Sequence, residues 1–324
     1  MNSLALLEGL FWTCCGAAAF VYLVYPLLIH ALSRIFGRVP VPLSVAGSHL
    51  PLVSVLVAAR DEELDIRARI ENLLALDYPS DRIEIVIASD GSTDRTNAIV
   101  REFENRGVTL LAFHENRGKA AVLNKVFPRL AGEIVLLSDA NTHMEPDAAR
   151  RLAAWFADPD VGVVCGRLVL TDPRTGRNVD GLYWKYETFL KKCESRLGAL
   201  LGSNGAIYAI RKALFPGVRP NTIIDDFVIP LEAKRRSGCR IVYDAGAVAH
   251  EETAPTMRAE FRRRVRIGAG SRASACCGGC SPRRTGGSPS PSSATSCSAG
   301  RARSSCSGRS ARTPCCSGAR GTTC

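Results

Sequence analysis

Charged residues are missing from one long stretch near the start of the chain. From Leu10 to Leu32 there is no Asp, Glu, Lys or Arg over 23 residues, and as a helix this stretch would be about 34 Å long, enough to cross a bilayer. No Lys or Arg precedes it, which argues against a cleavable signal peptide, although that interpretation and a buried helix of a soluble protein stay open. Arg34 and Arg38 follow it. The positive-inside rule therefore predicts a transmembrane anchor in residues 1–40, in the plasma (inner) membrane, with the rest of the chain in the cytoplasm.

Apolar residues are missing from the other end of the chain. From Gly268 to Cys324 only Ala, Cys, Gly, Ser, Pro, Arg and Thr occur, and no hydrophobic core can be built from that set. All seven residue types have codons with G or C at the second position, which is the alphabet that a GC-rich gene yields when it is read out of frame. We therefore expect a frameshift near residues 268–275, which makes 274–324 a low-complexity tail in place of an apolar segment. A natural disordered Ser/Arg tail is the alternative, and resequencing the gene would decide between them.

Acidic residues are also absent from this tail, and that absence explains most of the net charge. The chain carries a formal charge of +11, of which residues 274–324 contribute seven Arg and no Asp or Glu. The remainder is therefore only mildly basic, at 11 less 7, or +4. A charge of that size does not indicate a nucleic-acid partner.

Glycine-rich nucleotide-binding loops are missing from the part of the chain that looks folded. After the strand-like run LVSVLVAA the sequence has RDEE where a G-x-G-x-x-G fingerprint would stand, and no Walker lysine loop exists, so those two kinds of nucleotide site are excluded. What is present is an alternation of strand-like runs with helical runs. The strands are expected at 52–59, 82–89, 108–113 and 133–140, and the helices at 62–76, 94–105 and 119–130. This alternation predicts an α/β domain over residues 51–250, after a linker at 41–50, with a mostly parallel sheet covered by helices on both faces.

Acidic residues follow three of the four expected strands. Asp61 and Glu62 come after the first strand, Asp90 ends the second, and Asp139 ends the fourth. Ligands of such sheets bind beyond the carboxyl ends of the strands, and a carboxylate cannot face a diphosphate without a cation between them. The pattern predicts a nucleotide site that uses a divalent cation. Ordinary turns and helix caps at each of these positions are the alternative.

The three segments AARDEE, ASDGSTDRT and SDAN, in this order and spacing, resemble glycosyltransferase family 2, the inverting enzymes with the GT-A nucleotide-diphospho-sugar fold. The resemblance runs from about Leu10 to Gly270 and is greatest to the membrane synthases related to cellulose, hyaluronan and poly-N-acetylglucosamine synthases. It implies an enzyme anchored in the lipid bilayer that transfers a sugar from a UDP-sugar to a growing polysaccharide or a lipid-linked glycan. Two alternatives stay open: a catalytically impaired nucleotide-sugar-binding protein, because the C-terminal membrane region is lost, and a nucleotidyltransferase on a related fold.

The resemblance also implies roles for residues on the donor side of the site. Ala59, Arg60 and Glu62 occupy the positions that contact the nucleoside in the family, where Asp61 replaces the usual Asn. Asp90 matches the carboxylate that hydrogen-bonds uracil. Lys119, in the segment NRGKAAVLN, stands where an ammonium group could reach the diphosphate.

Further family positions concern the cation and the base. Asp139 matches the first Asp of the D-x-D motif that holds Mg2+ or Mn2+ against the donor phosphates, and Asn141 replaces the second Asp. In the segment IIDDFV, Asp226 matches the catalytic base and Asp225 stands in place of a Glu. That Asp226 merely caps the following helix is the alternative.

The last segment of the resemblance is EFRRRVRIG, expected to lie in an Arg-rich interfacial helix over residues 251–273. It matches the Q-x-x-R-W segment of processive enzymes, with Arg263 at the Gln, Arg266 at the Arg and Ile267 at the Trp. Arg263 and Arg266 are therefore expected near the diphosphate or at the anionic membrane surface. His250 remains open between a metal or diphosphate contact and a surface residue.

Overall fold

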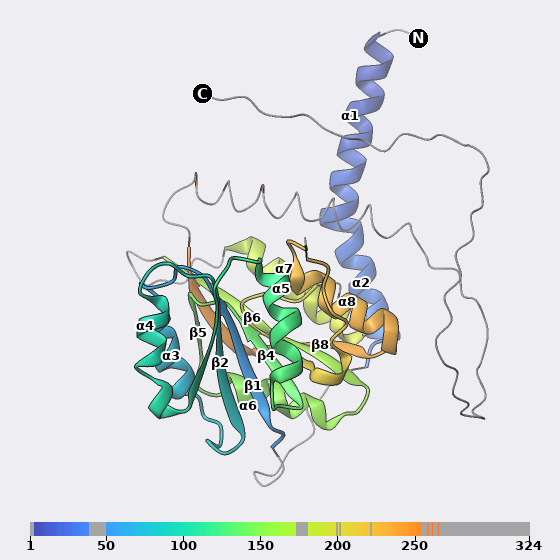
Figure 1. The fold of residues 1–324 in the computed structure, drawn as a ribbon. Helices are drawn as coiled ribbons and strands as arrows, with labels where there is room; N and C mark the ends of the chain where they lie inside the picture. Colours follow the sequence, from blue (N-terminus) through green and yellow to red (C-terminus); the bar gives the residue numbers. More distant parts are fainter. Residues whose placement is uncertain are drawn as a thin grey trace, which may run out of the picture. The chain divides into compact units, whose positions relative to one another are not determined.

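The computed structural model describes residues 3–38, 50–172, 181–198, 200, 202–220 and 222–253, with three single positions beyond them (Figure 1). Arg263, Arg266 and most of the expected interfacial helix lie outside the described residues, as do the expected linker, apart from residue 50, and the tail. The fold below is built from the described part of the chain.

An eight-stranded sheet forms the centre of the α/β domain, in the order β3-β2-β1-β4-β7-β6-β8-β5. Strands β3, β2, β1 and β4 are parallel, β7 is antiparallel to both of its neighbours, and β5 is antiparallel to β8. The strands are β1 (Val53–Ala59), β2 (Ile83–Asp90), β3 (Val108–Phe113), β4 (Ile134–Ser138), β5 (Thr142–Met144), β6 (Val161–Thr171), β7 (Tyr208–Arg211) and β8 (Arg240–Glu252). The four strands expected from the sequence are therefore present, and the expected α/β domain with a mostly parallel sheet is confirmed.

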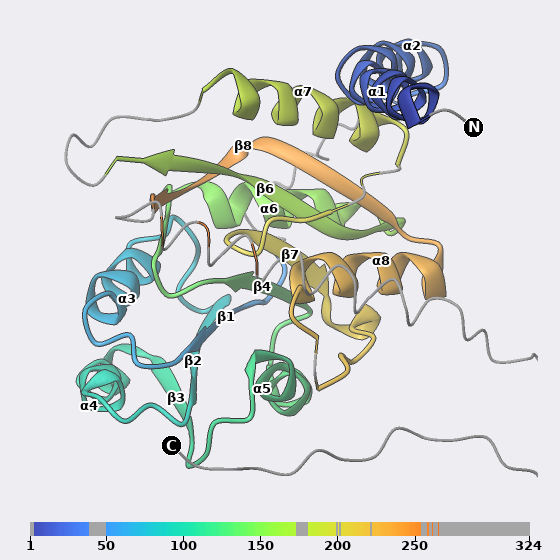
Figure 2. The same ribbon diagram turned by 90° about the horizontal axis from the view of Figure 1, so that it is seen from above.

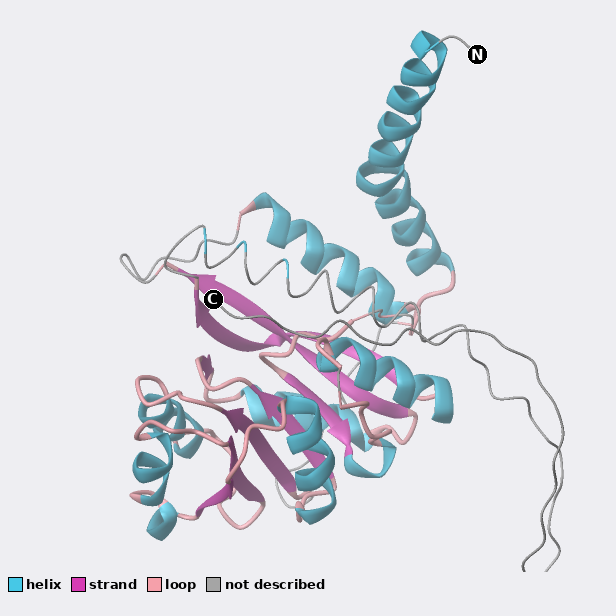
Figure 3. Ribbon diagram, turned by 45° about the horizontal axis from the view of Figure 1, so that its top comes forward, coloured by secondary structure: helices cyan, strands magenta, loops and turns pink. Residues whose placement is uncertain are grey.

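Helices cover both faces of this sheet, as the continuous apolar strands require. They are α3 (Ile66–Leu74), α4 (Thr96–Arg101), α5 (Lys119–Val126), α6 (Ala148–Ala154), α7 (Leu182–Arg196) and α8 (Asp225–Ser237). Figure 2 shows α3 and α4 on one side of strands β1 to β3 and α5 on the other. Figure 3 shows the strands lying between the flanking helices.

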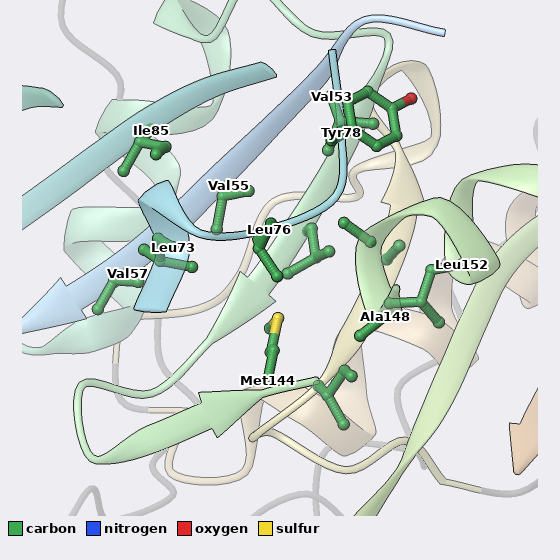
Figure 4. Packing of buried hydrophobic residues seen from close by; sticks show 14 of the residues in the cluster. Val53, Val55, Val57, Leu73, Leu76, Tyr78, Ile85, Met144, Ala148 and Leu152 are labelled. Atoms are coloured by element: carbon green, nitrogen blue, oxygen red, sulfur yellow. The ribbon is translucent and has the colours of Figure 1, made fainter. Parts of the chain in front are cut away.

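Two buried hydrophobic clusters follow from the alternation of side chains along β1. Val53, Val55 and Val57 face the cluster that α3, α4 and α6 close, whereas Leu56 faces the cluster that α5 and α8 close. Figure 4 shows the first of these, where Val55 and Val57 lie near Leu73 and Val53 lies beside Tyr78. The two clusters fix the sheet between its helices, so the loops at its carboxyl edge start from rigid positions.

The expected helices are shorter in the structure than in the sequence pattern. The one expected at 62–76 is α3, and the one expected at 94–105 divides into α4 and a short 3-10 turn at Glu104–Arg106. Residues 63–65 form a turn before α3, and Asp61, just before the expected start, adopts a left-handed conformation with φ at 53°. Helical residues do not adopt this conformation, and Asp and Asn tolerate it better than most residues.

The apolar N-terminal stretch is helical throughout its described residues. It consists of α1 (Ser3–Ala19), a π-helical turn (Phe20–Val24) and α2 (Tyr25–Ile35). Within the described residues, Leu7–Ile35 is the helix long and apolar enough to cross a membrane by length and composition. It contacts α7, where Tyr25 Oη donates a hydrogen bond to Glu194 at 2.7 Å.

Candidate active site

A cleft of about 920 Å³ opens at the carboxyl edge of the sheet. It collects residues from the ends of β1, β4 and β8, from the first residue of α5 and from the first turn of α8. Five residues expected from the sequence line it: Glu62, Lys119, Asp139, Asn141 and Asp226. Residues far apart in the chain therefore share one cleft.

Lys119 is the lysine among the described residues that line the cleft. Its ammonium nitrogen lies 2.9 Å from Asp139 Oδ1 and 3.5 Å from Asp225 Oδ2. Burial by itself would lower the pKa of Lys119, but the charges of Asp139 and Asp225 outweigh it, and the net effect raises the pKa. Lys119 is therefore charged and links the end of β4 to the start of α8.

The two adjacent aspartates at the start of α8 have different partners. Asp225 is buried and its Oδ2 faces Lys119, whereas Asp226 Oδ2 accepts a hydrogen bond from the Gly205 backbone N–H at 3.0 Å. Burial, and then the charge of Asp225, raises the pKa of Asp226 to about 6. A carboxylate with a pKa near the working pH is suited to accept a proton.

The carboxylate of Asp226 does not cap α8. Ile224 occupies the N-cap position, without a side-chain hydrogen bond, and Asp225 and Asp226 lie in the first turn. Acidic residues there interact favourably with the positive end of the helix dipole. The capping interpretation of Asp226 is therefore wrong for this structure, and its carboxylate is directed to the Gly205 segment instead.

Pro230 gives the backbone of Asp226 an unusual partner. Pro230 lies inside α8 and has no N–H, so the carbonyl of Asp226, four residues earlier, cannot receive the usual helical hydrogen bond. The Ser203 hydroxyl donates to that carbonyl instead. Both the main chain and the side chain of Asp226 are thus held by the segment 203–205.

The absence of a side chain at Gly205 allows this close approach. A Cβ atom at this position would lie 3.0 Å from Asp226 Oδ2 and 3.4 Å from Asp226 Cγ, which is tight for a side chain packed against a carboxylate. The structure thus places the segment GSNG, residues 202–205, beside the first turn of α8.

The carboxylates of Asp90 and Asp61 accept hydrogen bonds from neighbouring loops, and neither residue lines the cleft. Asp90 is buried, and its two oxygens each accept a backbone hydrogen bond at 2.8 Å, from Arg117 and Gly118. Asp61 Oδ1 accepts the Thr93 N–H at 2.8 Å. These bonds tie together the loops that follow β1, β2 and β3, and Asp90 does not line the cleft.

Ala59 and Arg60 also lie outside the cleft lining. Ala59 is part of the hydrophobic core, 2% exposed. Arg60 is exposed and lies 3.7 Å from Asp61. Of the three positions expected at the nucleoside, the structure places Glu62 in the cleft, and burial raises the pKa of its carboxyl group.

The donor set at the end of β4 suits a hard divalent cation that a ligand helps to hold. Asn141 uses its amide nitrogen to donate to Glu251 Oε1 at 3.2 Å, so the ligand it could offer a cation is its carbonyl oxygen. Among the described residues no group of three or more His, Cys, Asp or Glu side chains could hold a metal ion. Asp139 and Asn141 therefore fit Mg2+ or Mn2+ only with further oxygen ligands from a bound diphosphate or from water.

The described lining of the cleft is strongly acidic. It has seven carboxylate residues and one lysine, Lys119. The acidic residues are Glu62, Asp65, Asp139, Asp225, Asp226, Glu251 and Glu252. A nucleoside diphosphate would be repelled from such a surface unless a cation entered with it.

The sequence did not reveal every residue of the cleft. His143 and Asp65 line it. His143 lies in β5 between Thr142 and Met144, which are buried, and Asp65 immediately precedes α3. Glu251 and Glu252 line it as well, at the end of β8. Their neighbour His250 does not, because its Nε2 lies 2.8 Å from Glu145 Oε1.

Comparison with known proteins places these features in a family. The sequence model of glycosyl transferase family 2 matches residues 54–215, which is half of the chain. The beta-monoglucosyldiacylglycerol synthase of Nostoc sp. is 33% identical over 150 residues, which cover 45% of this chain and 32% of that protein. The poly-beta-1,6-N-acetyl-D-glucosamine synthase of Staphylococcus aureus is 28% identical over 227 residues, which cover 66% of this chain and 53% of that protein. The chain thus spans about half or less of the length of these curated relatives.

A solved structure supports the same assignment. The mannosyltransferase PcManGT from Pyrobaculum calidifontis, in complex with GDP-Man and Mn2+, has a TM-score of 0.67 and 26% sequence identity, and the match covers 82% of this chain and 76% of that one. The matched segment contains β1, β2 and β4 with the acidic residues that follow them. The chain belongs to glycosyltransferase family 2, the inverting GT-A enzymes that transfer sugars from nucleotide-sugar donors.

Proposed function

We propose that this chain is a membrane-anchored, metal-dependent glycosyltransferase that moves a sugar from a UDP-sugar to a growing polysaccharide or a lipid-linked glycan on the cytoplasmic side of the membrane. The observation that carries the proposal is the meeting of Asp139, Lys119 and Asp226 in one cleft. The names of the relatives support the acceptor class, since one synthesises a glucosyl lipid and another a polymer of N-acetylglucosamine.

The donor would occupy the end of the cleft near β4. Asp139 and the carbonyl oxygen of Asn141 would hold Mg2+ or Mn2+, which neutralises charge on the diphosphate leaving group when it is bound. Lys119 would turn from the carboxylates toward a phosphate oxygen, because an ammonium group binds phosphate as a point charge. Glu62 and, from the loop edge, the exposed Arg60 would face the nucleoside, while Asp90 holds the loop that carries Arg117 and Gly118.

The acceptor would be activated at the other end, by Asp226. Its carboxylate accepts the proton of the acceptor hydroxyl while that oxygen forms a bond to the anomeric carbon of the donor sugar. The bond from the same carbon to the diphosphate oxygen breaks, and the diphosphate leaves with the electron pair. Attack opposite the leaving group inverts the configuration. Asp225 is paired with Lys119, which leaves Asp226 as the better base of the two.

Substitution of the two key carboxylates tests the proposal. We expect Asp139→Ala and Asp226→Ala each to abolish sugar transfer, the first together with metal-dependent UDP binding and the second with UDP binding nearly unchanged. Asp81→Asn removes an exposed carboxylate whose side chain is 79% exposed and should leave both measurements at wild-type values. Ordinary turnover by Asp226→Ala would disprove the assignment of the base.

The donor base needs its own measurement, because the neighbouring PcManGT structure holds GDP-Man. Membranes containing the chain would be incubated with a panel of UDP-sugars and with GDP-mannose, with and without Mn2+. We expect release of UDP from one UDP-sugar, dependent on the cation. Release of GDP alone would contradict the UDP part of the proposal, and calorimetric binding of UDP without any turnover would support a non-catalytic sugar-nucleotide binder instead.

A further inference from the structure

A buried arginine lies near the cleft without any part in the chemistry above. Arg69, in α3, has 0% relative exposure. Its Nη1 donates a hydrogen bond to Asn72 Oδ1 at 2.8 Å, but among the described residues its Nε and Nη2 atoms have no hydrogen-bond partner. A buried cation with unpaired donors is unfavourable for folding. A core position on α3 would be more stable with an apolar side chain, so its charge and donors point to another role.

Asn72 connects this arginine to the strand after the cation-binding residues. Asn72 Nδ2 donates to the Met144 carbonyl at 2.8 Å, and the Met144 N–H donates to Asn72 Oδ1 at 2.9 Å. The same Oδ1 atom accepts from Arg69, so the orientation of the amide is determined by three hydrogen bonds. We call these two residues the Arg69–Asn72 clamp; it joins α3 to β5.

The clamp acts on a short segment that carries the expected cation ligands. Residues 139–144 run from the end of β4, which the sheet holds, to Met144 in β5, which both the clamp and the pairing of β5 with β8 hold. Asp139 and Asn141 lie between these two attachments. Because the segment is short and fixed at both ends, a displacement of Met144 is expected to shift Asp139 and Asn141 as well.

Arg69 also interacts electrostatically with the segment 139–144, through Asp139. Burial lowers the pKa of Arg69 to about 9, and the nearby charge of Asp139 opposes that decrease. The guanidinium is therefore still protonated at neutral pH. The charge of Asp139 stabilises the charged form of Arg69, so the two groups interact electrostatically.

We propose that Arg69 is a positioning residue, which acts through Asn72 and Met144 to hold Asp139 and Asn141 in the arrangement that a metal-bound nucleoside diphosphate requires. The inference rests on the proposed function. It assigns a role on the donor side of the reaction to a residue that touches neither the sugar nor the phosphates.

The test measures how UDP binding depends on Mn2+ in the full-length chain in detergent, by calorimetry. We expect Arg69→Met to raise the Mn2+ concentration for half-maximal UDP binding tenfold or more, and Asn72→Ala to raise it similarly. The double variant should exceed the larger single effect by less than threefold, because both residues act through one contact. Arg69→Lys keeps the charge without the planar fork and should give an intermediate shift of about threefold.

Arg67→Met is the matched control, since Arg67 lies in the same helix but is exposed and pairs with Glu102; its Mn2+ dependence should stay within twofold of wild type. A purely structural role would lower the melting temperature of Arg69→Met and leave the Mn2+ dependence unchanged, which would overturn the inference. Tighter Mn2+ binding would also overturn it, because loss of a nearby positive charge alone acts in that direction.

The remaining outcomes are also decided by this design. If Arg69→Met does not fold, Arg69→Lys and Asn72→Ala carry the test, and Mn2+ dependence within twofold of wild type in both refutes the positioning role. If wild-type UDP binding does not depend on Mn2+ at all, the proposed metal-dependent function fails before any variant is compared. Failure of the proposed function would therefore be seen in the wild-type protein, whereas failure of the inference would be seen in the Arg69 and Asn72 variants.

Discussion

Asp226 shows how a single residue acquires its properties from its surroundings. Its carboxylate is half-buried beside the charge of Asp225, and both factors raise its pKa, to about 6. The Gly205 N–H opposes that increase by donating to the ionised form. The result is a carboxylate that is ionised at neutral pH but close enough to its pKa to accept a proton.

This pKa predicts the pH dependence of catalysis. The base must be ionised to act, so kcat/KM of the wild-type enzyme should fall about tenfold per pH unit below a midpoint near 6, in proportion to the ionised fraction. The measurement is a kcat/KM profile from pH 4.5 to 8 with saturating Mn2+. A midpoint near 4 would mean that the proton acceptor is an ordinary exposed carboxylate.

The same pKa predicts that the site reduces stability. The folded state raises the pKa of Asp226 from 3.8 to about 6, so folding favours the protonated form, and the ionised form costs stability at pH values above 6. Asp226→Asn should therefore raise the free energy of unfolding by ~1–3 kcal/mol at pH 8. The gain should vanish below about pH 4, where the aspartate is protonated in both states. Thermal unfolding in detergent at the two pH values checks this, and equal shifts at both would contradict it.

Gly205 is a second residue whose role is determined by proximity. In Gly205→Ala the new Cβ would lie 3.0 Å from Asp226 Oδ2, so the carboxylate must move by a few tenths of an ångström. We expect kcat to fall about tenfold or more and UDP binding to stay within twofold of wild type. Gly202→Ala is the control in the same segment, since its Cβ would meet the Phe227 ring at 3.5 Å, an ordinary contact. Equal losses in both variants would argue against the specific contact.

Helix α8 illustrates how an element is adapted to hold Asp226, the proposed base. Pro230 removes the N–H that would bind the Asp226 carbonyl, and the Ser203 hydroxyl replaces it. In this way a helix-breaking residue brings in a hydrogen bond from another part of the chain. The first turn of α8 is thereby joined to the loop before β7.

This arrangement predicts a strong coupling between Ser203 and Pro230. Ser203→Ala should lower the free energy of unfolding by about 1–2 kcal/mol, because it leaves a partly buried carbonyl without a donor. In a Pro230→Ala background the N–H of the new alanine can bind that carbonyl, and Ser203→Ala should then have almost no effect. The double-mutant cycle is measured by chemical or thermal unfolding. The same loss in both backgrounds would show that Ser203 acts elsewhere.

The elements themselves were largely predictable from the sequence. The four parallel strands were expected because their apolar runs are continuous, and each lies within a residue or two of its expected bounds. Strands β5, β6 and β7 were not expected. Strands β5 and β7 are short, three and four residues long, and such segments become strands only because a neighbouring strand offers a partner.

At the scale of the whole molecule, the apolar N-terminal helix is the feature that bears on the proposed membrane placement. The helix Leu7–Ile35 is mostly exposed in the structure, with 6% of its most apolar window buried. A soluble core helix would be covered by its own protein, so this exposure supports a membrane environment. The contact of Tyr25 with Glu194 attaches the helix to α7.

Tagged chains test the membrane placement. With one tag at the N-terminus and another after the catalytic domain, we expect both to remain in the membrane fraction after alkaline carbonate extraction. The second tag should be accessible to protease in inside-out vesicles, since the positive residues follow the helix. A soluble product that lacks the N-terminal tag would instead identify the helix as a cleaved signal peptide.

Local sequence alone determined the α/β architecture, the apolar helix and the acidic residues at the carboxyl edge, because these depend on the periodicity of apolar side chains and on where each strand stops. It also identified the family, which the comparisons confirmed. Tertiary structure decided the partners of those acidic residues. Asp225 rather than Asp226 faces Lys119, Asn141 meets Glu251 across 110 positions of the chain, and Asp90 binds a loop. Such pairings depend on how distant elements pack, and burial and pairing, not residue type, set the charge and reach of each carboxylate.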